Sequence, residues 1–134
     1  MSAPQTKTVV VERDLPFAAA RIWRALTEPH LMAEWLMKSD FAPVVGHRFT
    51  LTSDHVVVDC QVRVVEPGRR LCYTWDAYGL ESVVTWTLTP TATGTHLRME
   101  QTGFRLDQAQ AYAGARQGWA QFLDALAQVL VRSA

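Results

Sequence analysis

Histidine and cysteine side chains are the first candidates for chemistry in this sequence, because they bind metals and transfer protons. The 134-residue chain contains His30, His47, His55, His96, Cys60 and Cys72. No two histidines form an HxH or HxxxH pair, and none lies close to both cysteines. The chain also lacks a GxGxxG segment after a strand, a Walker sequence and a GxSxG motif. We therefore predict no metal site, no cofactor and no serine nucleophile.

Carboxylates are the other candidates for catalysis. Asp59 lies within an apolar segment, and Asp76 and Glu100 lie near the ends of apolar segments. A carboxylate turned into an apolar interior would have a raised pKa and could serve as a general acid or base. Asp59, however, is out of phase with Val58 and Cys60, so we expect it to face solvent. We assign no catalytic residue, and whether the protein is an enzyme stays open.

Charge and composition narrow the classes of partner. Lys and Arg together number 13, as do Asp and Glu, so no overall field attracts nucleic acid or an anionic membrane. The start, MSAPQTKTVV, lacks the two regions of a secretory signal. No apolar run approaches the roughly 20 residues that span a bilayer. We therefore expect a cytoplasmic protein without membrane insertion, in which both cysteines are free thiols.

The elements that must position any site follow from hydrophobic periodicity. Residues 6–13 are rich in β-branched side chains and predict a strand, and two short helices follow within 17–29 and 30–37. Apolar alternation then predicts five strands, at 47–53, 55–66, 71–76, 82–90 and 95–104. A long amphipathic helix follows, with Asp107 as its expected N-cap. This order predicts one α+β domain with an antiparallel six-stranded sheet, spanning residues 1–134.

The inner faces of these elements are aromatic. Tyr73, Trp75, Trp86, Met99 and Trp119 are candidate walls of an apolar chamber between a curved sheet and the last helix, although such residues more often fill a core. Gln101 continues the same face of its strand. Because a buried amide needs partners, it either orients a ligand or bonds a neighbouring element, and the sequence leaves both open.

Two glycines in the last helix raise a separate question. Gly114 and Gly118 lie beside Trp119, and glycine in a helix costs about 1 kcal/mol relative to alanine. Gly118 either admits the close approach of a neighbouring element or leaves space between helix and sheet. We expect close packing, because protein interiors fill to high density by default.

Four segments together resemble a known family. They are VERDLPFAAARIWRALTEPHLMAEW, VVEPGRRLCYTW, VVTWTLTPTATGTHLRMEQTGF and GWAQFLDALAQVL. The chain is similar to the activator-of-heat-shock-protein-90-ATPase-like family, of the START-like (SRPBCC, helix-grip) superfamily, over a core of about residues 7–131. The resemblance implies a curved antiparallel sheet gripping the long terminal helix, with a cavity between them. It places the lining at Phe49, Tyr73, Trp75, Val84, Trp86, Met99, Gln101 and Trp119.

The leading functional hypothesis is a non-catalytic carrier or sensor that binds a small hydrophobic or aromatic molecule in this cavity. One alternative is a cyclase, dehydratase or hydrolase acting on a polyketide-like substrate, which needs an ionisable group inside the chamber, such as Asp76, Glu100 or Tyr73. Another is a stress-response protein that contacts a chaperone, which exposed Trp35 or Phe41 would favour. We expect no nucleic-acid partner, and a homodimer is compatible with each hypothesis.

Overall fold

A computed structural model describes residues 6–132 of the 134. The predicted domain limits include residues 1–5 and 133–134, which lie outside the described residues. The described chain forms seven strands and three helices. In chain order these are β1 Thr6–Leu15, α1 Ala19–Thr27, α2 Pro29–Trp35, β2 Lys38–Ser39, β3 Arg48–Thr52, β4 Val57–Glu66, β5 Arg70–Ala77, β6 Leu80–Pro90, β7 Thr95–Arg105 and α3 Ala109–Arg132.

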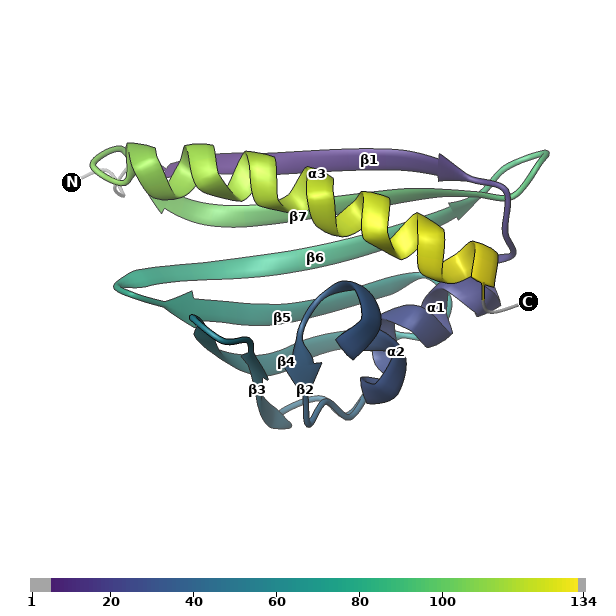
Figure 1. The fold of residues 1–134 in the computed structure, drawn as a ribbon, viewed down its shortest axis with the longest axis horizontal. Helices are drawn as coiled ribbons and strands as arrows, with labels where there is room; N and C mark the ends of the chain where they lie inside the picture. Colours follow the sequence, from purple (N-terminus) through teal and green to yellow (C-terminus); the bar gives the residue numbers. More distant parts are fainter. Residues whose placement is uncertain (1–5, 133–134) are drawn as a thin grey trace.

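All seven strands belong to one antiparallel sheet, in the order β1-β7-β6-β5-β4-β3-β2 (Figure 1). Strands β3 to β7 follow one another as a meander, and the last strand, β7, also pairs with the first, β1. The sequence prediction of six strands is wrong by one. Strand β2 has only two residues, which pair with Thr52 and Leu51, and a segment that short shows no periodicity.

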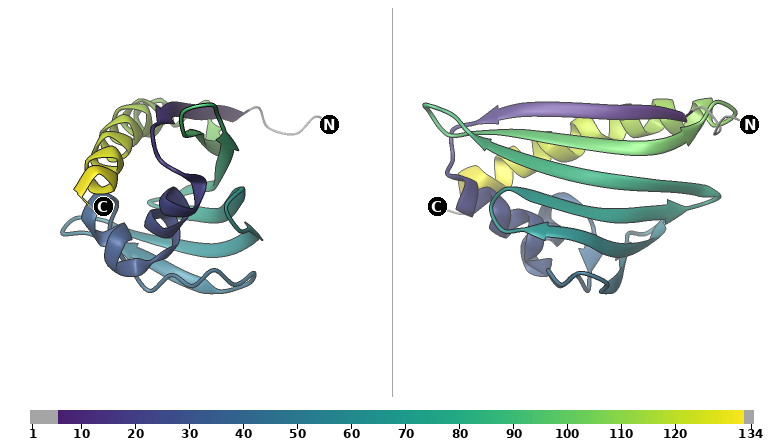
Figure 2. Two further views of the ribbon diagram at one scale, coloured as in Figure 1. Left: turned by 90° about the vertical axis from the view of Figure 1, so that its right-hand side faces the viewer. Right: turned by 180° about the vertical axis from the view of Figure 1, so that it is seen from behind.

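The sheet is curved, and all three helices lie on its concave side (Figures 1 and 2). Strand alternation decides which side chains point there. Val84, Trp86 and Leu88 of β6 are buried, while Thr85 and Thr87 between them are partly exposed. On β7 the same alternation buries Leu97, Met99 and Gln101. The concave face is therefore the apolar face that the sequence pattern predicts.

A β-bulge at Gly103 shifts that alternation near the end of β7. The register with β1 changes between Lys7 and Thr8, which pair with Phe104 and Thr102, so Gly103 is left over. Gly103 has φ +114°, and a Cβ there would come within 2.6 Å of the carbonyl oxygen of Glu81. Only glycine fits this position. After the bulge Phe104 is the residue that turns inward, and it packs against Tyr112 of α3 with ring centroids 5.7 Å apart.

Helix α3 begins at Ala109, two residues after the expected N-cap. The carboxylate of Asp107 accepts a bond from Arg105 instead, and the backbone carbonyl of Gln108 accepts the N–H of Tyr112. The two halves of the helix differ. Its second half carries large buried side chains, at Leu123, Leu126, Val129 and Leu130. These contribute to the single apolar core, and the first half borders the site described next.

Candidate functional site: an apolar cavity under the first half of α3

A cavity of about 630 Å³ lies between the sheet and the first half of α3. Drug-sized ligand sites in proteins are typically of about 300–1,000 Å³. From the sheet side and the segments next to it, the lining consists of Met37, Val56, Val58, Trp75, Ala77, Tyr78, Leu80, Gln101, Asp107 and Gln108. From α3 it consists of Ala109, Gln110, Ala111, Gly114, Ala115, Gly118, Trp119 and Phe122. The wall is thus mostly aromatic and aliphatic, with one buried amide.

Trp119 is the aromatic centre of the inner wall. Its ring lies 5.0 Å from that of Trp75, 5.6 Å from that of Trp86 and 5.5 Å from that of Phe122, measured between centroids. Such tilted and edge-to-face pairs stabilise beyond the area they bury. Trp119 is 2% exposed, whereas Phe122 is only partly buried and borders the open space. The indole therefore anchors α3 on the sheet at the inner end of the cavity.

A chain of hydrogen bonds holds Gln101 in place. Trp119 Nε1 donates to Gln101 Oε1 at 2.7 Å, and Gln101 Nε2 donates to Ser82 Oγ at 2.9 Å. Ser82 Oγ in turn donates to the carbonyl of Trp75 at 2.7 Å. The sequence left two roles open for this amide. The structure shows one of them, the bonding of neighbouring elements. The same amide also borders the cavity.

Neither glycine of α3 serves close packing, so the expectation for Gly118 is wrong. Apart from adjacent residues and the helix's own backbone, no atom lies within 4 Å of the position a Cβ would take at either residue. Gly114 is exposed and Gly118 partly buried, and both line the cavity. The usual default of dense filling fails here, because this side of the helix borders the cavity instead of another element.

Three of the eight residues predicted to line a cavity border this one: Trp75, Gln101 and Trp119. The other five, Phe49, Tyr73, Val84, Trp86 and Met99, are buried in the core outside its lining. Side chains of the segment 29–41 pack on three of these five, Phe49, Tyr73 and Trp86. Trp35 of α2 packs edge-on against Trp86 with centroids 5.7 Å apart, and Phe41 packs against Phe49 at 5.0 Å.

The prediction missed lining residues at the ends of strands. Val56 and Val58 share the parity of Cys60, and Ala77 continues that of Tyr73 and Trp75. Extending the alternation toward the ends of the two strands would have found them. Met37 follows α2, where no periodicity indicates its direction.

The cavity mouth lies between the β5–β6 turn and the start of α3. Tyr78 and Gly79 have φ of 51° and 81°, as a two-residue type I′ hairpin turn requires. Asparagine or glycine commonly occupies the first position, yet here it holds a tyrosine that is 80% exposed. Its hydroxyl donates to the carbonyl of His55, and Gln108 Nε2 donates to the carbonyl of Gly79. These bonds tie together three segments near the mouth.

The three groups named for the enzymatic hypothesis lie outside the cavity lining. The carboxylate of the lining is that of Asp107, which is exposed and paired with Arg105. Asp76 and Glu100 belong to the convex face of the sheet, where Glu100 pairs with Arg98. Tyr73 is 1% exposed, accepts a bond from Trp86 Nε1, and has a pKa raised by burial. Asp59 is exposed, as expected. Within residues 6–132, no three His, Cys, Asp or Glu side chains gather as a metal site.

Two further sequence expectations concern buried residues. Cys60 and Cys72 are both free and buried, which confirms the prediction of free thiols. Burial, with a smaller contribution from Asp76, raises the pKa of the Cys60 thiol.

Trp35 and Phe41 are each 4% exposed, and Trp35 Nε1 donates to the carbonyl of Ala25. The exposed aromatic surface that would favour a chaperone contact is therefore not present at these two residues.

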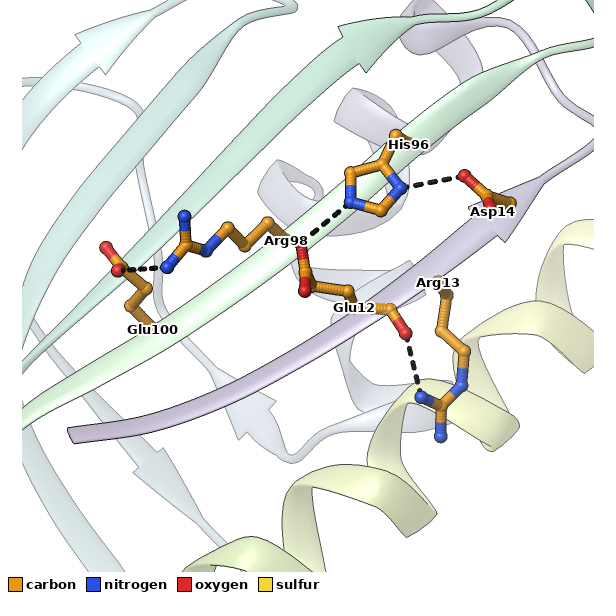
Figure 3. Close-up of polar contacts among 6 residues, drawn as sticks. All are labelled: Glu12, Arg13, Asp14, His96, Arg98 and Glu100. Carbon is orange, nitrogen blue, oxygen red and sulfur yellow. Dashed lines mark hydrogen bonds and ion pairs between the residues drawn. The ribbon is translucent and has the colours of Figure 1, made fainter.

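The convex face carries a charged cluster on β1 and β7, shown in Figure 3. His96 Nε2 lies 2.9 Å from Glu12 Oε1, and His96 Nδ1 lies 2.7 Å from Asp14 Oδ1. Both ring nitrogens must carry protons to donate to both carboxylates. The bonds to Glu12 and then to Asp14 therefore raise the pKa of His96 above 6.5.

This cluster predicts a pH dependence of stability. Because the pKa of His96 is raised on folding, its contribution is fully present below pH 6.5 and is lost as the pH rises through the folded-state pKa. Urea unfolding of wild type and His96→Gln should show a difference in midpoint at pH 6 that shrinks toward pH 9. Glu12→Gln with Asp14→Asn should weaken this trend. A difference that stays constant with pH would contradict the assignment.

A curved antiparallel sheet that holds a long C-terminal helix across its concave face, with a cavity between them, defines the helix-grip, START-like class of proteins. The chain belongs to the family described as Activator of Hsp90 ATPase homolog 1-like protein, which it matches over residues 16–131. The family resemblance seen in the sequence is thereby confirmed.

Solved structures agree with this assignment. Protein MLL2253 from Mesorhizobium loti is 56% identical with a TM-score of 0.93, and the match covers 96% of this chain and 99% of that one. DynU16, a protein in the dynemicin biosynthetic locus, is 28% identical with a TM-score of 0.84, over 92% of this chain and 46% of DynU16. Bacillus halodurans BH1534 shares the fold, at 24% identity and a TM-score of 0.82, over 92% of this chain and 96% of that one.

Among curated proteins none matches this chain. Within residues 6–132, no helix has the length and apolar character needed to cross a bilayer.

Proposed function

We propose that this protein binds a small hydrophobic or aromatic molecule in the cavity beneath α3, as a carrier or sensor that leaves the molecule chemically unchanged. The observation that carries the proposal is the cavity itself, a space of about 630 Å³ with a mostly apolar wall. Transfer of an apolar molecule from water into such a space is favourable in proportion to the area it buries. The cytoplasmic location and a homodimer stay predictions.

The aromatic wall favours ligands with rings. Trp75, Trp119 and Phe122 border the space, so a flat ligand can stack on or meet the edge of these rings. The only buried polar side chain of the wall, Gln101, already holds bonds to Trp119 and Ser82. Because this amide already has hydrogen-bond partners, a ligand does not need a polar group to pair with it. An apolar molecule therefore fits this wall.

One relative, DynU16, supports a role with small molecules. DynU16, at 28% identity, is named for a biosynthetic locus. The enzymatic alternative has less support, because Asp76 and Glu100 face away from the cavity and the hydroxyl of Tyr73 is bonded to Trp86. For this reason the proposal is of binding without turnover.

Titration with the fluorescent probe phenylnaphthylamine tests the proposal. We expect the probe's emission to rise and shift to the blue as it leaves water, and the emission of Trp75 and Trp119 to be quenched. The variant Ala111→Trp places an indole at the cavity border and should weaken binding. Ala113→Trp puts the same indole on an exposed position of α3 outside the lining, so it should bind like wild type.

Two results would count against this function. The first is no response of either fluorescence signal at probe concentrations that saturate other apolar sites. The second is equal binding by wild type and Ala111→Trp, which would locate the probe elsewhere. Native mass spectrometry of protein purified from lysate adds an independent readout, since a retained natural ligand appears as extra mass.

A further inference from the structure

The position of Gly114 and Gly118 on α3 is the starting observation. They are four residues apart, so they lie on one side of the helix, one turn from each other. Both belong to the cavity wall. Neither has the positive φ that would require glycine, since among the seven glycines of the chain only 46, 68, 79 and 103 have it.

The protein alone gives no structural reason for either glycine. A side chain at Gly114 or Gly118 would begin in open space, with no atom outside its own stretch of helix within 4 Å of the Cβ. Alanine at these two sites would strengthen the helix without a clash. Both glycines thus lower the stability of the helix at positions where packing does not require a glycine.

The rest of α3 makes the contrast clear. One turn beyond Gly118, Phe122 borders the cavity with a large ring, and Leu126 after it is completely buried in the core. Large side chains therefore fill the space between helix and sheet wherever the helix lies close to it. At Gly114 and Gly118 the space is kept empty, and the helix backbone itself becomes the wall.

We propose that Gly114 and Gly118 are the residues that set the upper size limit of the ligand. The inference rests on the proposed function. A ligand wide enough to reach the helix backbone, such as a fused system of several rings, occupies the room that the two absent side chains leave. A ligand of one or two rings fits between Trp75, Trp119 and Phe122 and does not need that room.

Two probes that differ in width test this size limit. Naphthalene has two fused rings and pyrene has four, and both are apolar and fluorescent. Each is titrated against wild type, Gly118→Leu and Gly114→Leu, and binding is followed by fluorescence. We expect Gly118→Leu to weaken pyrene binding about tenfold or more, as added bulk does in a closely fitting pocket. Naphthalene should bind the variant like wild type.

Ala113→Leu is the matched control, because it adds bulk to an exposed residue of the same helix outside the cavity wall. It should leave both affinities unchanged. Gly114→Ala and Gly118→Ala report on the fold, and we expect each to raise the denaturant midpoint of the ligand-free protein. A midpoint lowered by either alanine would mean that packing requires the glycine, which overturns the inference.

The outcomes separate this inference from the function it rests on. If wild type binds both probes and Gly118→Leu loses pyrene alone, the size limit is supported. If both leucine variants bind the two probes like wild type, or lose both equally while unfolding at an unchanged midpoint, the glycines do not set the limit and the binding function stands. If wild type binds neither probe, both proposals fail.

Discussion

Replacing Trp119 with alanine is expected to destabilise the protein by about 3–5 kcal/mol, the cost typical of removing a buried aromatic side chain. Trp119 is 2% exposed and joins the rings of Trp75, Trp86 and Phe122 at the point where α3 meets the sheet. Its removal also leaves Gln101 Oε1 without its donor. Urea unfolding followed by circular dichroism gives the free energy of unfolding.

Phe122→Ala is the matched control for this prediction. Phe122 lies on the same helix and the same cavity wall, but its ring is only partly buried and has no polar atom. We expect its replacement to cost clearly less than that of Trp119. Equal costs for the two variants would show that Trp119 is not the anchor of α3.

Replacing Gln101 with leucine should lower the free energy of unfolding by about 1–3 kcal/mol, because a buried donor is left without an acceptor. That donor is Trp119 Nε1, which bonds the amide at 2.7 Å. Leucine has nearly the same size, so the loss comes from hydrogen bonding rather than from a void. Urea unfolding measures it, with Thr102→Leu on the exposed side of the same strand as the control.

A double-mutant cycle gives this prediction its sharpest form. Trp119→Phe removes the donor, so the pair Gln101→Leu with Trp119→Phe should be more stable than the sum of the single changes predicts. A coupling of about 0.5–3 kcal/mol is usual for residues that share a bond. Additive effects would contradict the bond. Phenylnaphthylamine binding by Gln101→Leu separates the two roles of the amide, since a structural amide leaves the affinity for an apolar probe intact.

Helix α3 has two structural roles along its length, as part of the core and as a wall of the cavity. Beyond Trp119 the large side chains of α3 at Leu123, Leu126 and Val129 are buried in the core. Before Trp119 one side of the helix borders the cavity, and Tyr112 packs on Phe104. Trp119 and Gln101 hold the helix at the boundary between the two parts. Any ligand that enters from the side of Tyr78 and Gln108 meets this pair at the inner end of the cavity.

The periodic spacing of apolar residues in the sequence predicted much of the fold. Alternating apolar residues located the strands from β3 to β7, and β-branched residues located β1. Spacings of three and four placed Trp119, Leu126 and Val129 on the buried side of α3. These features depend only on the direction of successive side chains, which local backbone geometry determines. Strand β2 escaped because a two-residue strand has no period.

The cavity itself depended on tertiary structure. Tyr73, Trp75 and Ala77 lie on the same side of β5, yet Tyr73 is covered by Phe41 and Phe49 whereas Trp75 and Ala77 border open space. Sequence spacing determined that all three point inward. It did not determine where the segment 29–41 ends on the concave face, because that depends on how far each packed element reaches.

The two glycines show the same distinction between what the sequence and what the tertiary structure determines. The sequence alone showed that Gly114 and Gly118 weaken a helix, and the default of dense packing suggested a close neighbour for Gly118. The bulge at Gly103 and the curvature of the sheet are cooperative properties of the seven paired strands, so no local pattern reports them. The type of each residue and the face it occupies were thus determined by the sequence. Whether that face meets another side chain or an empty space was decided by the distance between helix and sheet in the folded protein.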